Sequence, residues 1–171
     1  KTLGLIGYGN IGTQTGIMAE AMGMKVKFYD VEAKLPLGNA VSVKSIKDLV
    51  SSSDIISVHV PETLQTKNLI SNEVIKQCKT GSILINYARG EVVDLNALAA
   101  ALKSKHITGA AIDVYPLEPE KNGDKFETPL QGLSNVILTP HIGGSTEEAQ
   151  ENIGEDVSVK LYQYLERGVS N

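Results

Sequence analysis

The chain has 171 residues, of which 42% are hydrophobic and 21% charged, and its formal net charge is −4. This length fits one domain with a sizeable core, and the composition is that of an ordinary water-soluble protein. The mild acidity and the lack of a basic run argue against nucleic acid or a membrane as a partner. The single Cys78 cannot close an internal disulfide, and we predict a reducing, cytoplasmic location.

Short β-rich runs alternate with amphipathic helical segments along the chain. We predict strands near residues 2–6, 25–29, 41–43, 54–60, 82–86, 108–113 and 136–139. We predict helices near residues 11–23, 45–52, 71–78, 94–104 and 146–167. Strands 82–86 and 110–112 are apolar on both faces, as a covered parallel sheet requires. The predicted fold class is therefore α/β, a doubly wound parallel sheet in three layers (α/β/α), with ligands at the carboxyl ends of the strands.

A glycine-rich turn, Gly7-Tyr8-Gly9-Asn10-Ile11-Gly12, follows the first predicted strand and opens a helical segment. The first glycine permits the tight turn, the second lets a pyrophosphate approach the backbone, and the third lets helix and strand pack closely. The phosphates would then lie at the positive end of the helix dipole. In this context the motif predicts a Rossmann-type dinucleotide site rather than a glycine turn that binds nothing.

Asp30 ends the second predicted strand, 23 residues after Gly7. A carboxylate at this point can accept hydrogen bonds from both ribose hydroxyls and would repel a 2′-phosphate, so NAD is favoured over NADP. No arginine follows Asp30 closely, and Lys34 is the nearest cation after it. The alternative is an ordinary exposed acid at a strand end.

Polar residues also follow the later strands. Arg89, just past strand 82–86, can hold a carboxylate through two parallel hydrogen bonds, unless it is a structural arginine paired with Glu91 or Asp94. Asp113 ends the next strand and could hold the nicotinamide amide or ribose, or else bond only to backbone. His59 ends the fourth strand, and for its side chain we favour structural packing on the adenine side of the site.

His141 lies in Thr-Pro-His-Ile-Gly-Gly-Ser, directly after the last strand, where a histidine can give or take a proton near neutral pH. Glu118 is the best-placed carboxylate to orient its ring. Alternatively, loop backbone satisfies His141, and Glu118 is a solvated acid like its neighbour Glu120. Glu118 lies in an irregular stretch, 115–134, that is long for a compact domain and typical of a functional loop.

The last predicted helix begins with a capping box formed by Ser145 and Glu148. Its apolar residues recur every fourth position and make one stripe: Ala149, Ile153, Val157, Leu161 and Leu165. This stripe either covers the sheet or packs on a further domain, and the sequence does not separate the two. No cysteine or histidine pair has the spacing of a metal site.

Four motifs together resemble the D-isomer-specific 2-hydroxyacid dehydrogenases over essentially the whole chain. They are Gly-Tyr-Gly-Asn-Ile-Gly, Asn-Tyr-Ala-Arg-Gly, Asp-Val-Tyr-Pro-Leu-Glu-Pro at 113–119 and Thr-Pro-His-Ile-Gly-Gly-Ser-Thr. The resemblance implies that Arg89 binds substrate, that His141 is the catalytic histidine and that Glu118 is its partner. Tyr87 is a departure, because related enzymes often carry alanine there.

The resemblance also implies an NAD site. Its predicted residues are Gly7, Tyr8, Gly9, Asn10, Ile11, Gly12, Asp30, His59, Val60, Pro61, Ala88, Arg89, Asp113, His141, Gly143 and Gly144. The predicted reaction moves hydride between NAD and a small 2-hydroxy acid. A non-enzymatic NADH-sensing module and a sister enzyme acting on glyoxylate, lactate or formate stay open as alternatives.

The abrupt start in a strand, together with the resemblance, suggests that residues 1–171 are the nucleotide-binding domain of a longer chain. The substrate-binding and regulatory domains of the family would then lie outside it. The resemblance further implies a homodimer, or a higher homo-oligomer, that pairs through the nucleotide domain.

Overall fold

The computed structural model describes residues 1–119, 121 and 123–168, so Glu120 lies outside the described residues. Two compact units make up the chain, Lys1–Thr139 and Pro140–Asn171, and each is considered by itself. None of the helices in the described ranges combines the length and the apolar character needed to cross a bilayer.

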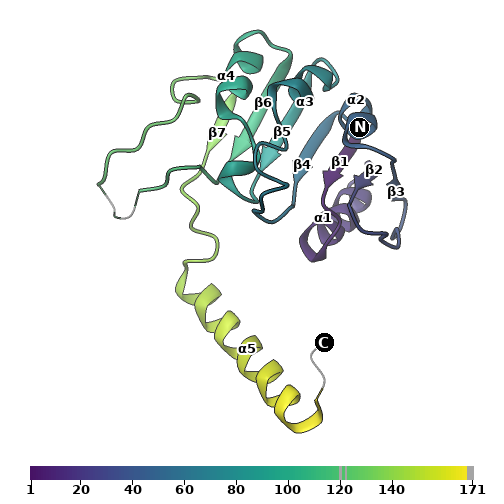
Figure 1. The fold of residues 1–171 in the computed structure, drawn as a ribbon, viewed down its shortest axis with the longest axis vertical. Coiled ribbons are helices and arrows are strands. Elements are labelled where there is room, and N and C mark those ends of the chain that lie inside the picture. The colour runs from purple at the N-terminus through teal and green to yellow at the C-terminus, as the bar shows by residue number, and fades with distance from the viewer. Residues whose placement is uncertain (120, 122, 169–171) are drawn as a thin grey trace. The chain divides into compact units, whose positions relative to one another are not determined.

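The first unit is built on a seven-stranded parallel sheet with the order β3-β2-β1-β4-β5-β6-β7 (Figure 1). Its strands are β1 (Thr2–Ile6), β2 (Lys25–Tyr29), β3 (Val41–Ser42), β4 (Ile55–Val58), β5 (Ser82–Asn86), β6 (Ile107–Ile112) and β7 (Val136–Leu138). Its helices are α1 (Asn10–Ala21), α2 (Ile46–Ser52), α3 (Asn72–Gln77) and α4 (Leu95–Lys103), with a 3₁₀ turn, η1 (Gly90–Val92). The chain adds β2 and β3 on one side of β1 and then β4 to β7 on the other side, so the strand order reverses between β1 and β4. This confirms the predicted doubly wound α/β fold.

Helices lie on both faces of this sheet. On one face, Leu3 and Leu5 of β1 pack in a cluster with Ala19 of α1. On the other, Ile6 packs with Leu49 of α2 in a larger cluster that also takes in α3 and α4. Alternate residues of a strand point to opposite faces, so the two clusters define three layers.

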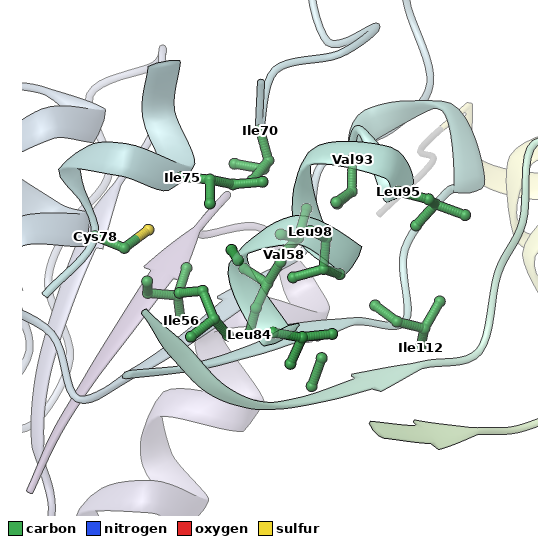
Figure 2. Close-up of a cluster of buried hydrophobic side chains, with 14 of the residues drawn as sticks. Ile56, Val58, Ile70, Ile75, Cys78, Leu84, Val93, Leu95, Leu98 and Ile112 are labelled. Atoms are coloured by element: carbon green, nitrogen blue, oxygen red, sulfur yellow. The ribbon is translucent and has the colours of Figure 1, made fainter. Parts of the chain in front are cut away.

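The larger cluster is the main core. Its side chains come from β1, β4, β5 and β6, from α2, α3 and α4, and from the turns between them. Figure 2 shows part of this cluster, with Ile56, Leu84 and Leu98 among its members. Cys78 is buried there, and burial raises the pKa of its thiol to about 12. It is therefore a small apolar core residue and not a thiolate nucleophile.

Coverage of the sheet within the first unit is uneven. Ile83 of β5 is 38% exposed and Ile137 of β7 is 63% exposed. Both lie on the α1 side of the sheet, where the contacts of α1 with the strands are mainly to β1 and β2. Strand β5 therefore has one closed face and one partly open face.

Side-chain caps fix where three helices of the first unit begin. Ser45 accepts a hydrogen bond from the Asp48 N–H at the start of α2, and Ser71 caps α3 through the Val74 N–H. Asp94 accepts from the Asn96 and Ala97 N–H groups at the start of α4. Helix α1 differs, because its N-cap is Gly9 and it has no side-chain cap.

The second unit contains α5 (Glu147–Arg167), which buries none of its residues. Its N-cap is Thr146, whose side chain accepts from the Ala149 N–H at 3.1 Å. The predicted capping box at Ser145 is therefore wrong by one residue, because the hydroxyl that reaches the third helical N–H belongs to Thr146. Both readings of the apolar stripe on α5 stay predictions.

Candidate cofactor and active site

The carboxyl ends of six strands lie at one level along the sheet. Registered pairs join Ile6 to Tyr29 and to Val58, and further pairs link Val58, Asn86, Ile112 and Leu138 in turn. Most of the predicted polar residues follow these positions directly. The topology therefore brings the predicted site residues of the first unit to one edge of the sheet, although they are far apart in the sequence.

The glycine turn is tightly built around its first and third glycines. Gly7 has φ +92°, and a Cβ there would lie 2.7 Å from the carbonyl oxygen of His59. A Cβ on Gly12 would lie 2.2 Å from the carbonyl oxygen of Gly7. Both positions therefore require glycine, the first for its conformation and for space, the third because helix and turn nearly touch.

The second glycine faces open space. A Cβ on Gly9 would meet no atom within 4 Å, and the first turn of α1 carries no acidic residue. The N–H groups at the start of α1 are thus free of a side-chain cap, and their partial positive charge suits an anion. These features fit the pyrophosphate of a dinucleotide.

Asp30 is held in place by backbone donors. One carboxylate oxygen accepts from the Tyr8 N–H at 2.7 Å, and the other accepts from the Glu32 N–H at 2.9 Å. These bonds tie the end of β2 to the glycine turn. The Tyr8 side chain is buried and stacked on Phe28, with ring centroids 3.9 Å apart, so Tyr8 borders the turn through its main chain.

Lys34 lies in the loop after β2 and pairs with Glu32 at 2.5 Å. This hydrogen bond, with the nearby charges of Glu32 and Asp30, raises the pKa of Lys34. The ammonium group is therefore already engaged by a carboxylate, which is the arrangement expected of a site that does not take a 2′-phosphate.

His59 and Val60 form the other wall of the turn. The His59 N–H donates to the Ile6 carbonyl at 2.7 Å, and a Val60 methyl lies 3.1 Å from the Cβ position of Gly7. Burial lowers the pKa of His59. Pro61 is exposed, and its carbonyl accepts from the Thr66 hydroxyl.

Arg89 lies at the surface after β5, on a loop organised by Asn86. The Asn86 amide donates to the Arg89 carbonyl at 3.0 Å and accepts from the Ala88 N–H at 3.1 Å. The predicted alternative partners of Arg89 are engaged elsewhere: Glu91 pairs with Lys67, and Asp94 caps α4. Among the described residues Arg89 makes no ion pair, and its guanidinium donates only to the Ala88 carbonyl.

The loop after β6 approaches Arg89 through Gly90. A Cβ on Gly90 would lie 2.1 Å from the carbonyl carbon of Tyr115, so only glycine allows the two loops to meet. In this loop Glu118 accepts from the Tyr115 N–H at 2.9 Å. The Tyr115 hydroxyl donates to the carbonyls of Ile112 and Thr139, both at 3.0 Å, and so anchors the loop to β6 and to the end of β7.

Asp113 accepts a 2.5 Å hydrogen bond from the Thr139 hydroxyl, and its own N–H donates to Asn86. The sequence alone assigns no role to Asn86, Gly90, Tyr115 or Thr139, although all four lie inside the motifs that carry the resemblance. The missing signal was spatial, because each acts by joining the ends of neighbouring strands.

His141, Gly143 and Gly144 belong to the second unit. His141 has φ +53°, in the left-handed region that non-glycine residues rarely adopt. Strained backbone of this kind is common at functional sites, so its position in the motif is consistent with a catalytic role. Its pairing with Glu118 stays a prediction.

Comparison with known proteins places these features in one family. The family model described as D-isomer specific 2-hydroxyacid dehydrogenase, NAD binding domain, matches residues 1–143. The chain therefore belongs to the NAD-binding domains of the D-isomer-specific 2-hydroxyacid dehydrogenases. NAD is accordingly its cofactor, as the glycine turn and Asp30 predict.

Individual relatives extend this result. The D-3-phosphoglycerate dehydrogenase of Escherichia coli K12 is 58% identical over 168 residues, which are 98% of this chain and 41% of that protein. The enzyme of the same name from Dictyostelium discoideum is 52% identical over 170 residues, 99% of this chain and 42% of that one. The chain thus spans about two fifths of the length of these relatives.

Solved structures support the same family assignment. An NAD complex of a D-isomer specific 2-hydroxyacid dehydrogenase from Lactobacillus delbrueckii ssp. bulgaricus has a TM-score of 0.84 at 32% identity, over 97% of this chain and 53% of that one. An NAD-dependent formate dehydrogenase from Staphylococcus aureus, solved with NAD, has a TM-score of 0.82 at 33% identity, over 96% and 48%.

Proposed function

We propose that this chain is the NAD-binding domain of a D-3-phosphoglycerate dehydrogenase. The reaction is the reversible oxidation of 3-phosphoglycerate to 3-phosphohydroxypyruvate, a step of serine biosynthesis. NAD, when bound, supplies the hydride acceptor and, in reverse, the donor. The identity of 52–58% to enzymes of this name supports the choice of substrate.

The observation that carries the proposal is the register of the strand ends. It sets the glycine turn and Asp30 on one side of the edge, and Arg89, Asp113 and Glu118 on the other. A dinucleotide lying along this edge would have its pyrophosphate over Gly9 and its reactive end toward Asp113. Such a division is what a hydride-transferring domain needs.

Each proposed catalytic residue has one task. The Arg89 guanidinium holds the carboxylate or the C2 oxygen of the substrate through parallel N–H donors. An imidazole nitrogen of His141 takes the proton from the C2 hydroxyl on oxidation and returns it on reduction. The Glu118 carboxylate orients the ring and stabilises its protonated form.

We further propose that the chain is one domain of a longer, cytoplasmic protein that acts as a homodimer or a higher homo-oligomer. The length of the relatives supports the first point. Exposed apolar side chains on α1 and at its C-cap are consistent with the second, since Met18 is 59% and Met22 is 74% exposed. We expect the 171-residue chain to bind NADH but to turn over poorly, and robust turnover by it alone would contradict this division of labour.

The first experiment measures NADH oxidation by the whole protein with 3-phosphohydroxypyruvate, beside a His141→Ala variant. General acid–base catalysis contributes about 10²–10⁴-fold, so kcat should fall by that factor while NADH still binds. A His106→Gln variant, changed at a histidine that bonds to the Ile75 carbonyl, is the matched control and should keep its activity. Equal activity of His141→Ala and the parent would refute the catalytic assignment.

A sister activity on another 2-keto acid is the second candidate, because the fold neighbours at 31–33% identity include a glyoxylate reductase and a formate dehydrogenase. A panel of pyruvate, glyoxylate and 3-phosphohydroxypyruvate separates these activities by kcat/KM. NADH binding without turnover of any 2-keto acid would favour the sensing module.

A further inference from the structure

Ser57 is a buried polar residue at the centre of the sheet with no role assigned so far. It is 4% exposed and lies on β4, paired with Leu5 on one side and Ile85 on the other. Its hydroxyl has one hydrogen-bond partner among the described residues, Nε2 of His59 at 2.9 Å. Ser57 and His59 are two residues apart, so both point to the α1 side of the sheet.

This single contact decides which ring nitrogen of His59 carries the proton. The buried hydroxyl hydrogen of Ser57 needs an acceptor, and Nε2 is the only one within reach in the described structure. If Nε2 carried the proton instead, Ser57 would hold a buried donor without a partner, which is costly. Ser57 therefore donates to Nε2, and the hydrogen of His59 lies on Nδ1.

His59 in turn contacts the end of β1 and the glycine turn through its backbone and Cβ. Its N–H bonds to the Ile6 carbonyl, its carbonyl oxygen lies against Gly7, and its Cβ lies 3.6 Å from the Cβ position of Gly12. The ring, which extends from this Cβ to Ser57, therefore begins beside the junction of the turn and α1. Movement of His59 would therefore displace the backbone of the glycine turn, which approaches the pyrophosphate.

We propose that Ser57 is a positioning residue of the NAD site, which locks His59 as the Nδ1–H tautomer and thereby holds the glycine turn in its cofactor-binding form. Burial of His59 also lowers its pKa, in agreement with an uncharged ring. The inference depends on NAD binding by this fold and not on which 2-hydroxy acid is the substrate. A failure of the proposed substrate would leave it intact.

His106 provides an internal reference for the test. Its Nε2 lies 2.9 Å from the Ile75 carbonyl, which can only accept, so His106 must be the Nε2–H tautomer. Long-range ¹H–¹⁵N correlation spectra of the ¹⁵N-histidine-labelled chain should therefore show two opposite tautomers. Variants His59→Asn and His106→Gln assign the signals. An Nε2–H pattern for His59 would overturn the proposal, whether or not any variant folds.

Affinity measurements then test the functional part. Ser57→Ala should raise the Kd for NADH about fivefold, the effect of one lost hydrogen bond, with His59 turning to mixed tautomers. His59→Gln places an amide near the position of Nε2 and should retain more affinity than His59→Asn, which is too short to reach Ser57. In a His59→Asn background, Ser57→Ala should not raise the Kd for NADH further, because both substitutions break the same contact. An unchanged Kd in a folded Ser57→Ala protein would overturn the positioning role.

Discussion

The carboxyl edge of the sheet has two differently built halves. The dinucleotide half comprises residues 7–12, 30 and 59, at the ends of β1, β2 and β4. The polar-loop half comprises residues 86–90 and 113–118, at the ends of β5 and β6. In the first, backbone atoms approach one another so closely that a Cβ on Gly7 or Gly12 would overlap a carbonyl oxygen. In the second, the exposed Arg89 extends from a loop whose backbone is held by a hydrogen bond from the Asn86 amide to the Arg89 carbonyl.

This difference separates binding from chemistry. The dinucleotide half is preorganised by main-chain packing, so changes at its closely packed positions, Gly7 and Gly12, should damage folding and cofactor affinity together. The polar-loop half holds its functional side chains by local hydrogen bonds. Changes at the tips of those side chains should therefore affect the reaction and leave the fold unchanged. Four predictions test this contrast.

The largest effect is expected for Gly12→Ala. The new methyl group would lie 2.2 Å from a backbone oxygen that cannot move away alone. Overpacking of this kind costs about 2–3 kcal/mol of unfolding free energy, and we expect NADH binding to be lost. Urea denaturation and NADH fluorescence titration measure the two quantities.

Gly9→Ala is the matched control, since its methyl would meet nothing within 4 Å in the protein. It should keep the stability of the parent yet weaken NADH binding, because the methyl occupies the space proposed for the pyrophosphate. Normal NADH affinity of Gly9→Ala would show that the cofactor does not approach there.

In the polar-loop half, Arg89→Ala should lower kcat/KM of the whole protein about 100-fold, the effect of losing two charge-assisted hydrogen bonds. The melting temperature and the Kd for NADH should stay near those of the parent, because within the described residues the Arg89 guanidinium bonds only to the Ala88 carbonyl. Arg89→Lys keeps the charge but not the planar pair of donors, so it should recover only part of the loss. Full activity of Arg89→Lys would exclude bidentate recognition.

A smaller effect is expected for Glu32→Gln at the rim of the dinucleotide half. This change removes one negative charge and releases Lys34 from its ion pair. Exposed pairs are weak, so affinity for NADPH should rise only about threefold with little change for NADH. Parallel titrations with the two cofactors give the ratio, and an unchanged ratio would leave Asp30 as the sole source of discrimination.

The smallest effect on the site is expected from a substitution of Asp54, which precedes β4 at the amino-terminal edge of the sheet. The Lys79 side chain and the Thr2 N–H hold the pKa of Asp54 at about 2, below its ordinary value of 3.8. A depressed folded-state pKa adds stability that is fully present above about pH 4 and is lost as pH falls toward 2. Asp54→Asn should therefore unfold more easily at pH 7, and its difference from the parent should vanish toward pH 2. Its Kd for NADH should be unchanged, and a change would mean that the two edges are coupled.

Most of the fold could be predicted from local pattern. All seven strands and all five helices lie within two residues of the predicted ranges, because apolar periodicity and turn residues set these boundaries. Strand 54–60 was predicted too long, since His59 and Val60 leave the ladder to form the wall of the glycine turn. The glycine motif and Asp30 were readable in sequence because their spacing is itself the signal.

Tertiary structure alone decided how these parts are joined. The sequence by itself determined the alternation of elements, the dinucleotide motif and the residue types available for chemistry, since these depend on neighbours along the chain. It could not show that Asn86 organises the Arg89 loop, that Gly90 admits Tyr115, or that Ser57 fixes the tautomer of His59. Those contacts arise from the register of parallel strands and the packing of their ends, which bring together residues with no local signal of their partnership.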